Sequence, residues 1–368
     1  MPTNTPNVNK LNTAKTVLVA PLDWGLGHAT RCIPIVKDLL LQGFEVLIAA
    51  DGKIYDLLYL EFPQLTFLPL QGYKIGYSYK KNSFFYKMLL QIPKIYKIIK
   101  HENRWLNKVI KEHKIDIILS DNRFGLYSKN ATCIFITHQL NIKTGNRFSE
   151  KIAQKINYAY INKYKECWVI DDATENNLAG SLSHPKKMPA IPVHYISALS
   201  RFNYFKAEKT NDLLMVLSGP EPQRTIFEKI LIAQVKDLKI KMILIRGLPN
   251  EPEQLINENK NLVILNHCNA HALNKIILAS EITISRSGYT SVMDYAILQT
   301  KVIYVPTPGQ TEQEYLAAYL SEKNYGVTVL QEGFNINTAF DAIANINLVP
   351  YPSFNELALK EAIRSLLL

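Results

Sequence analysis

The fold of this chain is most constrained by a series of short apolar runs, each followed by a longer segment with helical periodicity. The runs are rich in Val, Ile and Leu and do not alternate with polar residues. Strands of this kind are typical of parallel sheets that carry helices on both faces. The runs form two sets, which are 16–22, 44–51, 65–70, 115–121, 131–138 and 166–171 in the first, and 213–219, 241–247, 262–266, 281–287, 301–306 and 326–331 in the second.

Two such sets in succession predict an α/β protein with two Rossmann-like, doubly wound domains that face each other across a cleft. A chain of 368 residues is long enough for two domains. The stretch 188–202 contains Pro and Ser and is the expected junction. We therefore predict an N-terminal domain over 1–200 and a C-terminal domain over 201–350. The last segment, 351–368, has helical periodicity, and in this architecture we expect it to pack back on the first domain.

Composition narrows the class of protein further. The net charge of +10 suits a nucleic acid, a phosphorylated substrate or a membrane surface, and charge alone does not choose among them. The cysteines (Cys32, Cys133, Cys167 and Cys268) form no CxxC motif and are interpreted as reduced thiols of a cytosolic protein. The N-terminus lacks the apolar core of a signal peptide, and no run is long enough to span a membrane. We therefore expect a cytoplasmic protein.

Ligands of open α/β sheets bind beyond the carboxyl ends of the strands, so functional side chains are expected at the strand ends. The first strand leads through a glycine turn, 23–27, to His28 at the beginning of a helix. Glycines let a ligand approach the backbone, and a helix start offers free N–H groups to an anion. A histidine suits proton removal near neutral pH, so His28 is the candidate general base. A dinucleotide site is disfavoured because Thr30 replaces the third glycine of its fingerprint, and a histidine that only caps the helix is the alternative.

Two later strand-to-helix junctions also carry polar groups. In ISRSGYTSVMDYAILQ, 284–299, Ser287 is the expected N-cap of a helix whose N–H groups could cradle a phosphate near Gly288. In YVPTPGQTEQEYLAAYL, 304–320, amides and carboxylates open the next helix and suit a hydroxyl-rich ligand such as a sugar. The alternative for the first segment is a plain strand-to-helix turn. The alternative for the second is that its acidic residues only interact with the helix dipole.

With these stretches the sequence resembles GT-B glycosyltransferases, most closely the family 28-like group that contains the undecaprenyl-linked N-acetylglucosaminyl transferase of peptidoglycan synthesis. GLGHATR resembles that group's first-strand loop, RSGYTSVMDYA its donor-binding strand–helix unit, and VPTPGQTEQEYLAAYL its sugar-binding loop. The resemblance covers both domains in order. It implies the GT-B fold and a nucleotide-sugar donor, most often a UDP-sugar, bound mainly by the C-terminal domain.

The resemblance also implies donor-binding residues. Ser287 and Gly288 would bind the diphosphate, Asp294 stands where the family has a glutamate that holds the ribose, and Gln313 stands where a glutamine reaches the sugar. Glu314 replaces a second glutamine, and because a carboxylate cannot donate hydrogen bonds this departure puts N-acetylglucosamine as the sugar in doubt. The other expected donor contacts are Gly27, Arg246 and Gln310.

The acceptor side and the mechanism follow from the same resemblance. FITHQLNI, 135–142, resembles the family's acceptor-side motif, so His138 and Gln139, together with Asp23, are the expected acceptor contacts. The group inverts the anomeric centre in one displacement. His28 would take the acceptor proton, and Asp121, at the end of 115–121, would orient His28 or bind the acceptor, with a loop cap as the alternative.

The departing diphosphate needs charge stabilisation. We expect it from the N–H groups around Ser287 and Gly288, with Arg286 or Arg246 as helpers. Arg224, in the loop after the strand 213–219, could also touch the phosphates, or it could face solvent. No metal-ligand cluster is evident in the sequence, so we expect metal-independent transfer without a cofactor, the nucleotide sugar being a substrate.

The segment 73–114 alternates lysines with aromatic and aliphatic residues. A basic amphipathic segment predicts contact with an anionic membrane, which would make the protein peripheral on the inner face and its acceptor lipid-linked. Pro93 is expected to break or kink the helix. A core-facing helix with a solvated lysine face is the alternative, and no nucleic-acid motif accompanies the segment. The expected apolar patch is Phe84, Phe85, Met88, Leu89 and Ile92, surrounded by Lys80, Lys81, Lys87, Lys94 and Lys97.

The sequence therefore predicts an inverting hexosyl or N-acetylhexosaminyl transferase of cell-envelope glycan synthesis. It would move a sugar from a nucleotide-sugar donor, UDP-N-acetylglucosamine among the candidates, to a hydroxyl of a glycan or lipid-linked acceptor. One alternative is a nucleotide-sugar 2-epimerase of the same architecture, which would convert the donor without an acceptor. The other is a non-catalytic nucleotide-sugar-binding protein.

Overall fold

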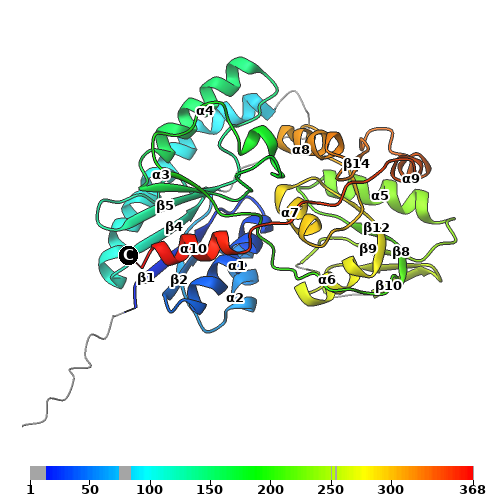
Figure 1. The fold of residues 1–368 in the computed structure, drawn as a ribbon, viewed down its shortest axis with the longest axis horizontal. Coiled ribbons are helices and arrows are strands. Elements are labelled where there is room, and N and C mark those ends of the chain that lie inside the picture. The colour runs from blue at the N-terminus through cyan, green and yellow to red at the C-terminus, as the bar shows by residue number, and fades with distance from the viewer. Residues whose placement is uncertain (1–13, 74–83, 250, 253–254, 368) are drawn as a thin grey trace, which may run out of the picture.

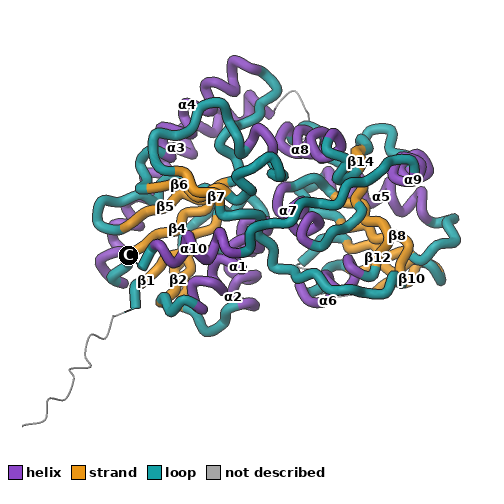
Figure 2. Tube along the Cα trace, in the orientation of Figure 1, coloured by secondary structure: helices purple, strands orange, loops and turns teal. Residues whose placement is uncertain are grey.

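The computed structural model describes residues 14–73, 84–249, 251–252 and 255–367, and it contains two α/β domains that lie side by side (Figure 1). Each domain is built on a seven-stranded sheet. Figure 2 shows the strands at the centre of each domain and the helices outside them. Among the helices of the described residues, none is both long and apolar enough to cross a membrane.

The N-terminal sheet is parallel throughout, with the strand order β3-β2-β1-β4-β5-β6-β7. The order reverses beside β1, so the carboxyl ends of β1 and β4 form the edge where such sheets bind ligands. The strands are β1 (Thr16–Pro21), β2 (Glu45–Ala50), β3 (Thr66–Pro69), β4 (Ile117–Asp121), β5 (Thr132–Thr137), β6 (Glu166–Val169) and β7 (Val193–Tyr195). The helices are α1 (Leu26–Leu41), α2 (Gly52–Glu61), α3 (Phe84–His113) and α4 (Arg147–Ile161), with a 3-10 turn at Gly180–Leu182.

Strand β1 explains why the predicted runs do not alternate. Val17 and Val19 pack into the core beneath α1 and α2, whereas Leu18 and Ala20 pack into the core on the other face, which includes Leu106 of α3. Because successive side chains of a strand point to opposite faces, a strand that is covered on both faces must be apolar at every position.

The C-terminal sheet has the order β10-β11-β9-β8-β12-β13-β14, in which β10 alone runs antiparallel to its neighbour. Here the order reverses beside β8, and the loops after β8 and β12 meet at this point. The strands are β8 (Asn211–Val216), β9 (Met242–Ile245), β10 (Leu255–Asn259), β11 (Leu262–Leu265), β12 (Ser280–Ser285), β13 (Val302–Tyr304) and β14 (Val327–Thr328). The helices are α5 (Gln223–Val235), α6 (Ala270–Leu278), α7 (Tyr289–Ile297), α8 (Thr311–Glu322) and α9 (Ile336–Ala344), followed by α10 (Leu357–Ser365).

Each predicted apolar run contains a strand, and β7 and β10 are two edge strands that the runs did not predict. Strand β7 falls inside the expected junction 188–202 and extends the N-terminal sheet. Helix α10 lies beside α1 on the N-terminal domain (Figure 1). Gln42 Nε2 donates to the Lys360 carbonyl at 3.1 Å, and Lys15 Nζ donates to the Leu366 carbonyl at 2.7 Å.

Helix α3 contains Pro93, which was expected to break or kink it. The helix runs without interruption from Phe84 to His113 and contains Pro93, so the proline does not break it. Its C-terminal part packs Leu106, Val109 and Ile110 into the core. Lys94 and Lys97 are exposed. The rest of the expected patch, which is Lys80, Lys81 and the side chains of Phe84, Phe85, Lys87, Met88, Leu89 and Ile92, lies outside the described residues.

Candidate active site at the domain junction

The glycine turn after β1 sets the position of His28. Gly25 is the N-cap of α1 and has φ 135°, a backbone conformation that favours glycine. The helix begins at Leu26, so His28 lies in its first turn, and its N–H donates to the Gly25 carbonyl at 3.4 Å. The turn therefore holds the imidazole beside the carboxyl end of β1.

Asp121 is the last residue of β4 and pairs in register with Pro21 of β1. This pairing brings Asp121 Oδ2 to 2.9 Å from His28 Nδ1. The Asp121 side chain is 1% exposed, whereas that of His28 is 15% exposed. In the described part of the chain, no group lies within hydrogen-bond distance of His28 Nε2. The two residues proposed for proton transfer are thus in contact, and among the described residues none hydrogen-bonds to the second ring nitrogen of His28.

Arg31 is a member of this cluster that the sequence reasoning missed. Its guanidinium is buried and reaches both carboxylate oxygens of Asp121, with Nε 2.9 Å from Oδ2 and Nη2 in contact with Oδ1. Nη2 is also 2.8 Å from His28 Nδ1. The sequence did carry a signal for Arg31, which is the last residue of GLGHATR. A residue three positions after His28 lies on the same face of the helix.

The charges of the cluster favour a neutral histidine beside an ionised aspartate. Burial, and next the Arg31 cation, lower the pKa of His28 and outweigh Asp121, which raises it. Burial raises the pKa of Asp121, but Arg31 and His28 outweigh it and hold that pKa below its usual range. His28 Nδ1 faces both an acceptor, Asp121 Oδ2, and a donor, Arg31 Nη2. The neutral tautomer that donates from Nδ1 to Asp121 has its lone pair on Nε2, as a general base requires.

His138 follows β5 and connects this cluster to the other domain. Arg31 Nη1 lies 3.0 Å from His138 Nδ1, and since a guanidinium only donates, Nδ1 is the acceptor. The proton is then on Nε2, which donates to Glu312 Oε1 of α8 at 2.8 Å. The ring also stacks on Tyr289 of α7 with a centroid distance of 4.4 Å. Both ring nitrogens are therefore engaged by the protein, and the acceptor contact expected of His138 from the sequence stays a prediction.

Glu312 completes this contact from the C-terminal domain. Burial raises its pKa, but the neighbouring His138 and Arg31 outweigh burial, so the pKa lies below the usual value. Its side chain is 34% exposed. An ionised carboxylate thus faces the buried Arg31–His138 pair across the junction of the two domains.

Helix α7 packs against α1 at the same junction. Tyr289 Oη donates to the Ile170 carbonyl at 2.8 Å, and Thr290 Oγ1 donates to the Gly27 carbonyl at 3.2 Å. A Cβ at Gly27 would lie 2.9 Å from Thr290 Oγ1. Gly27, expected to contact the donor, is therefore the point where the two domains approach each other most tightly in the turn.

Helix α8 is also held against the N-terminal domain. The Ser181 N–H donates to Tyr315 Oη at 2.7 Å, and Thr311 Oγ1 donates to the Lys143 carbonyl at 2.6 Å. Gly180 has φ 51°, and a Cβ there would lie 2.5 Å from Tyr315 Oη. The helix that opens with the expected sugar-binding residues thus makes several contacts with the opposite domain.

The start of α7 differs from the prediction. Gly288, not Ser287, is the N-cap, and it supplies no side-chain cap. The Ser287 hydroxyl is buried and donates to the Gln313 carbonyl at 2.8 Å, so the predicted N-cap role of Ser287 is wrong. A Cβ at Gly288 would meet nothing within 4 Å. The first N–H groups of α7 therefore begin beside open space, which suits an anion.

Arg286 does not have the predicted role as a helper of the diphosphate. Its buried guanidinium donates to the carbonyls of Val305, Pro306 and Gln223 and to the Gln331 side chain, and it lies over the Phe227 ring. Burial lowers its pKa to about 10. These bonds hold the loops after β12 and β13, so the cation is directed into the domain.

Two further arginines form an ion-pair network near the loops after β8 and β9. Arg246 donates to Glu228 Oε1 at 2.7 Å and to Asn266 Oδ1 at 2.9 Å, and it is 28% exposed. Arg224 is nearly buried and donates to Glu221 and to Glu228 Oε2 at 2.6 and 2.5 Å. Arg246 retains some exposure toward a ligand, whereas Arg224 mainly fixes the loop.

The loop between β13 and α8 is held by its own polar side chains. Gln313 accepts from the Thr307 N–H at 2.9 Å and donates to Gln310 Oε1 at 2.6 Å. Glu314 accepts from the Gly309 N–H at 3.1 Å. The three expected sugar contacts are thus brought together, and they give the loop a defined shape.

Asp294 lies on α7 and accepts a hydrogen bond from Ser200 Oγ at 2.5 Å. Burial raises the pKa of this carboxyl to about 7, against the opposing effects of Ser200 and Arg201. The group expected to hold a ribose therefore titrates near neutral pH.

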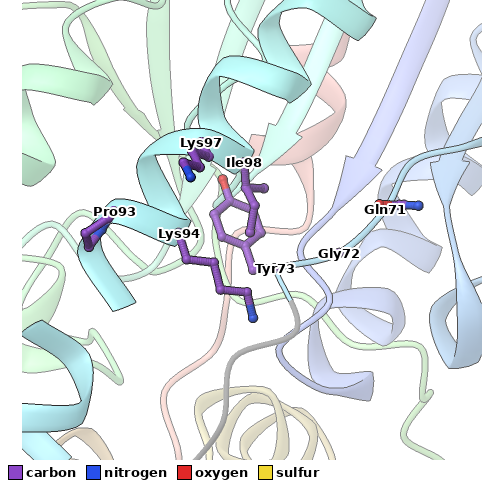
Figure 3. Close-up of a pocket in the computed structure, with 7 residues that line it drawn as sticks. All are labelled: Gln71, Gly72, Tyr73, Pro93, Lys94, Lys97 and Ile98. Carbon is purple, nitrogen blue, oxygen red and sulfur yellow. The ribbon is translucent and has the colours of Figure 1, made fainter. Parts of the chain in front are cut away.

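Asp23 accepts from the Tyr73 N–H at 2.8 Å. A hollow of about 520 Å³ lies between the segment 71–73 and α3 (Figure 3). The Gln139 N–H donates to Thr137 Oγ1 at 2.9 Å, which shapes the turn after β5. The hollow is lined by Gln71, Gly72, Tyr73, Pro93, Lys94, Lys97 and Ile98.

Comparison with known proteins agrees with this architecture. Residues 213–358 match the glycosyltransferase family 28 C-terminal domain. An uncharacterized glycosyltransferase of Methanosarcina mazei is 23% identical over 336 residues, covering 82% of each chain. The structure of the spinosyn rhamnosyltransferase SpnG complexed with thymidine diphosphate has a TM-score of 0.58 at 12% identity and covers 96% of this chain and 95% of that one. MurG of Acinetobacter baumannii has a TM-score of 0.52 at 13% identity, covering 96% and 94%. The predicted GT-B fold is confirmed.

Proposed function

We propose that this chain transfers a sugar from a nucleotide sugar to a hydroxyl with inversion. The chain is a glycosyltransferase, because residues 213–358 match the glycosyltransferase family 28 C-terminal domain and the fold is GT-B. The observation that carries this proposal is the His28–Asp121 contact of 2.9 Å at the domain junction. It supplies a base where an acceptor hydroxyl could meet a donor held by the other domain.

In the proposed step, the acceptor oxygen attacks the anomeric carbon while His28 Nε2 takes the hydroxyl proton. The bond from the anomeric carbon to the phosphate oxygen breaks, and the nucleoside diphosphate leaves with the electron pair. Asp121 accepts from Nδ1–H and stabilises the imidazolium that forms. Arg31 fixes the orientation of Asp121 through its two oxygens. A positioned base of this kind contributes roughly 100- to 10,000-fold in rate.

The donor would lie between the start of α7 and the loop before α8. The open space at Gly288 and the uncapped N–H groups of α7 suit the diphosphate, and they would stabilise the charge that develops on it. Asp294 would accept from the ribose hydroxyls, and Gln310, Gln313 and Glu314 would face the sugar. Arg246, with its exposed part, is the proposed cationic helper. In this scheme no cofactor or metal ion takes part.

For the donor base we propose uridine, because the resembled group uses mostly UDP-sugars, while the SpnG structure contains thymidine diphosphate. A hexose or N-acetylhexosamine is the proposed sugar, and a glycan or lipid-linked molecule the proposed acceptor. The segment 73–114 remains our proposal for contact with an anionic membrane, on the strength of its basic and aromatic sequence.

The test is calorimetric titration of the protein with UDP, dTDP and GDP, followed by the corresponding sugar nucleotides. We expect micromolar binding of UDP that is lost in Gly288→Val, since that side chain would occupy the open space at the start of α7. Glu314→Gln is the matched control and should keep nucleotide affinity. Binding of none of the nucleotides would refute the proposal, and conversion of the donor without an acceptor would indicate an epimerase instead.

A further inference from the structure

Glu312, in the first turn of α8, contributes a carboxylate from the C-terminal domain to the polar cluster around His28. Its Oε1 accepts from His138 Nε2 at 2.8 Å. The preceding residue holds this end of the helix on the N-terminal domain, because Thr311 Oγ1 donates to the Lys143 carbonyl at 2.6 Å. Glu312 therefore meets His138 in the arrangement in which the start of α8 is seated against the N-terminal domain.

The Glu312 carboxylate fixes which nitrogen of His138 carries the proton. An ionised carboxylate accepts hydrogen bonds and does not donate them, so the proton of a neutral His138 is on Nε2 and Nδ1 keeps a lone pair. That lone pair accepts from Arg31 Nη1 at 3.0 Å. Because the hydrogen bond at one ring nitrogen sets the tautomer, Glu312 determines whether Arg31 finds an acceptor on His138.

Arg31 and Asp121 make opposite demands on the Nδ1 atom of His28. Arg31 Nη2 lies 2.8 Å from this nitrogen, and Asp121 Oδ2 lies 2.9 Å from it. A hydrogen bond from Nη2 needs a lone pair on Nδ1, which puts the ring proton on Nε2 and leaves no base there. A hydrogen bond to Asp121 needs the proton on Nδ1 and leaves the lone pair on Nε2. The position of the Arg31 guanidinium therefore decides between a basic and a non-basic form of His28.

We propose that Glu312 is a positioning residue that keeps His28 in its basic tautomer from across the domain junction. With Glu312 in place, His138 Nδ1 accepts from Arg31 Nη1 and holds the guanidinium back from His28. Without Glu312, His138 can carry its proton on Nδ1, which leaves two donors facing each other, and Arg31 turns toward His28 Nδ1. The His28 proton then moves from Nδ1 to Nε2 by exchange with water, and the charge of the ring does not change. The inference rests on the proposed function, because it assigns a helper to the proposed base.

This role links the base to the position of α8. If α8 moves away from the N-terminal domain, Glu312 leaves His138, and His28 loses the lone pair on Nε2. The helix that begins among the expected sugar contacts would thus also prepare the base on the opposite domain. Proton removal from the acceptor would then require the two domains to be joined.

The test is nuclear magnetic resonance of the full chain labelled with 15N in its histidines, recorded without nucleotide. The nitrogen chemical shifts distinguish a protonated from an unprotonated ring nitrogen, and His28→Asn identifies the signals of His28 by their loss. The ring is neutral at about pH 8, because burial and Arg31 lower the pKa of His28 below its ordinary value. We expect the proton on Nδ1 in the unaltered protein and mainly on Nε2 in Glu312→Leu. The turnover number of Glu312→Leu should fall roughly 100-fold at unchanged nucleotide affinity.

A second set of variants tests the route through His138. In His138→Asn the amide oxygen takes the place of Nδ1 and accepts from Arg31 without help from Glu312. Adding Glu312→Leu to this variant should therefore change neither the His28 signals nor the turnover number, whereas Glu312→Leu alone should change both. Equal effects of Glu312→Leu in the two backgrounds would overturn the proposal.

Tyr319→Phe is the matched control, because it removes a different hydrogen bond between the same helix and the N-terminal domain. Tyr319 Oη donates to Asn177 Oδ1 at 2.9 Å. Its loss should leave the His28 signals and the turnover number as they are in the unaltered protein. Thermal melts on every variant separate loss of one hydrogen bond from loss of the fold.

Two further results would overturn the proposal. One is a proton on His28 Nε2 in the unaltered protein, and the other is identical His28 signals in the unaltered protein and Glu312→Leu. Failure of the proposed function is distinguished from both. It would appear as full turnover in His28→Asn, while the His28 signals of Glu312→Leu would still differ from those of the unaltered protein.

Discussion

His138 of the N-terminal domain and Glu312 of the C-terminal domain are joined by a hydrogen bond of 2.8 Å between Nε2 and Oε1. The same histidine accepts from Arg31, which in turn holds Asp121 and contacts His28. The candidate base is thus connected to the opposite domain through a continuous series of polar contacts. The arrangement of the two domains therefore affects how His28 is held.

His28→Asn should lower the turnover number by roughly 100- to 10,000-fold, because it removes the proposed base. Nucleotide affinity should stay the same, since His28 lies on the acceptor side. The measurement is steady-state transfer with the donor that calorimetry identifies. His113→Asn, at the exposed end of α3, is the matched control, and equal activity of the two variants would show that His28 is not the base.

Arg31→Met should destabilise the fold by about 3–5 kcal/mol, since it leaves the Asp121 carboxylate buried without its cation. Urea unfolding of the two proteins measures this difference. Adding Asp121→Asn to the Met variant should recover part of the loss, because the uncompensated charge is then gone. A double variant less stable than Arg31→Met would contradict the assigned pairing.

Glu312→Gln should make the protein less sensitive to acid. The folded pKa of Glu312 lies below its unfolded value, so its stabilising contribution is complete above about pH 4.5 and is lost as the pH falls. Its partly exposed side chain limits the effect near pH 7 to less than about 1 kcal/mol. Thermal melts between neutral pH and about pH 3 would show a smaller decrease for the variant, and parallel curves would oppose this assignment.

Asp294 should make nucleotide binding depend on pH near neutrality. Its pKa of about 7 means that it ionises as the pH rises through this value, and the carboxylate accepts from ribose hydroxyls better than the acid does. UDP affinity should therefore increase with pH through 7, more steeply than in Asp294→Asn. Calorimetry at several pH values compares the unaltered protein with Asp294→Asn. Because UDP titrates equally in both experiments, the difference between the two proteins does not contain that contribution. Equal slopes would exclude the ribose contact.

The Asp294 carboxyl group changes the stability of the fold with pH in the opposite direction to Glu312. Because the pKa of Asp294 is raised on folding, the folded state favours the neutral acid, and this contribution decreases as the pH rises from about 4 to about 7. Asp294→Asn should thus gain stability relative to the unaltered protein as the pH rises over this range, in melts recorded without nucleotide.

Gly27→Ala should separate the domains or strain their contact, because the new Cβ would lie 2.9 Å from Thr290 Oγ1. Overpacking of this kind costs about 1–3 kcal/mol. Thr290→Ala in the same chain should restore stability by removing the opposing oxygen. A urea-unfolding cycle of the two single variants and the double variant tests the contact, and additive effects would show that the residues do not meet.

Several features of the site were available from local sequence. The apolar runs predicted the strands because a strand covered on both faces must be apolar at successive positions, as Val17 to Ala20 are. The turn before His28 was predictable since Gly25 supplies the backbone conformation that the turn requires. Strands β7 and β10 escaped prediction because edge strands need no long apolar run.

Other features depended on which groups meet in space. A buried polar side chain must form hydrogen bonds, but the local sequence does not identify its partners. Ser287 has the composition of an N-cap, yet its hydroxyl bonds to the Gln313 carbonyl, because α8 lies beside it. Arg286 follows a strand at a ligand-binding edge, yet its guanidinium is buried because it donates to the neighbouring carbonyls of Val305 and Pro306.

The sequence by itself determined the two α/β domains and the placement of a histidine beyond the first strand, since both follow from patterns within one turn or one strand. Only the tertiary structure decided that Arg31, His138 and Glu312 belong together. His138 lies 107 residues from Arg31 and 174 residues from Glu312. Hydrogen bonds act over about 3 Å, and the packing of two separate sheets alone brings such distant residues within that range.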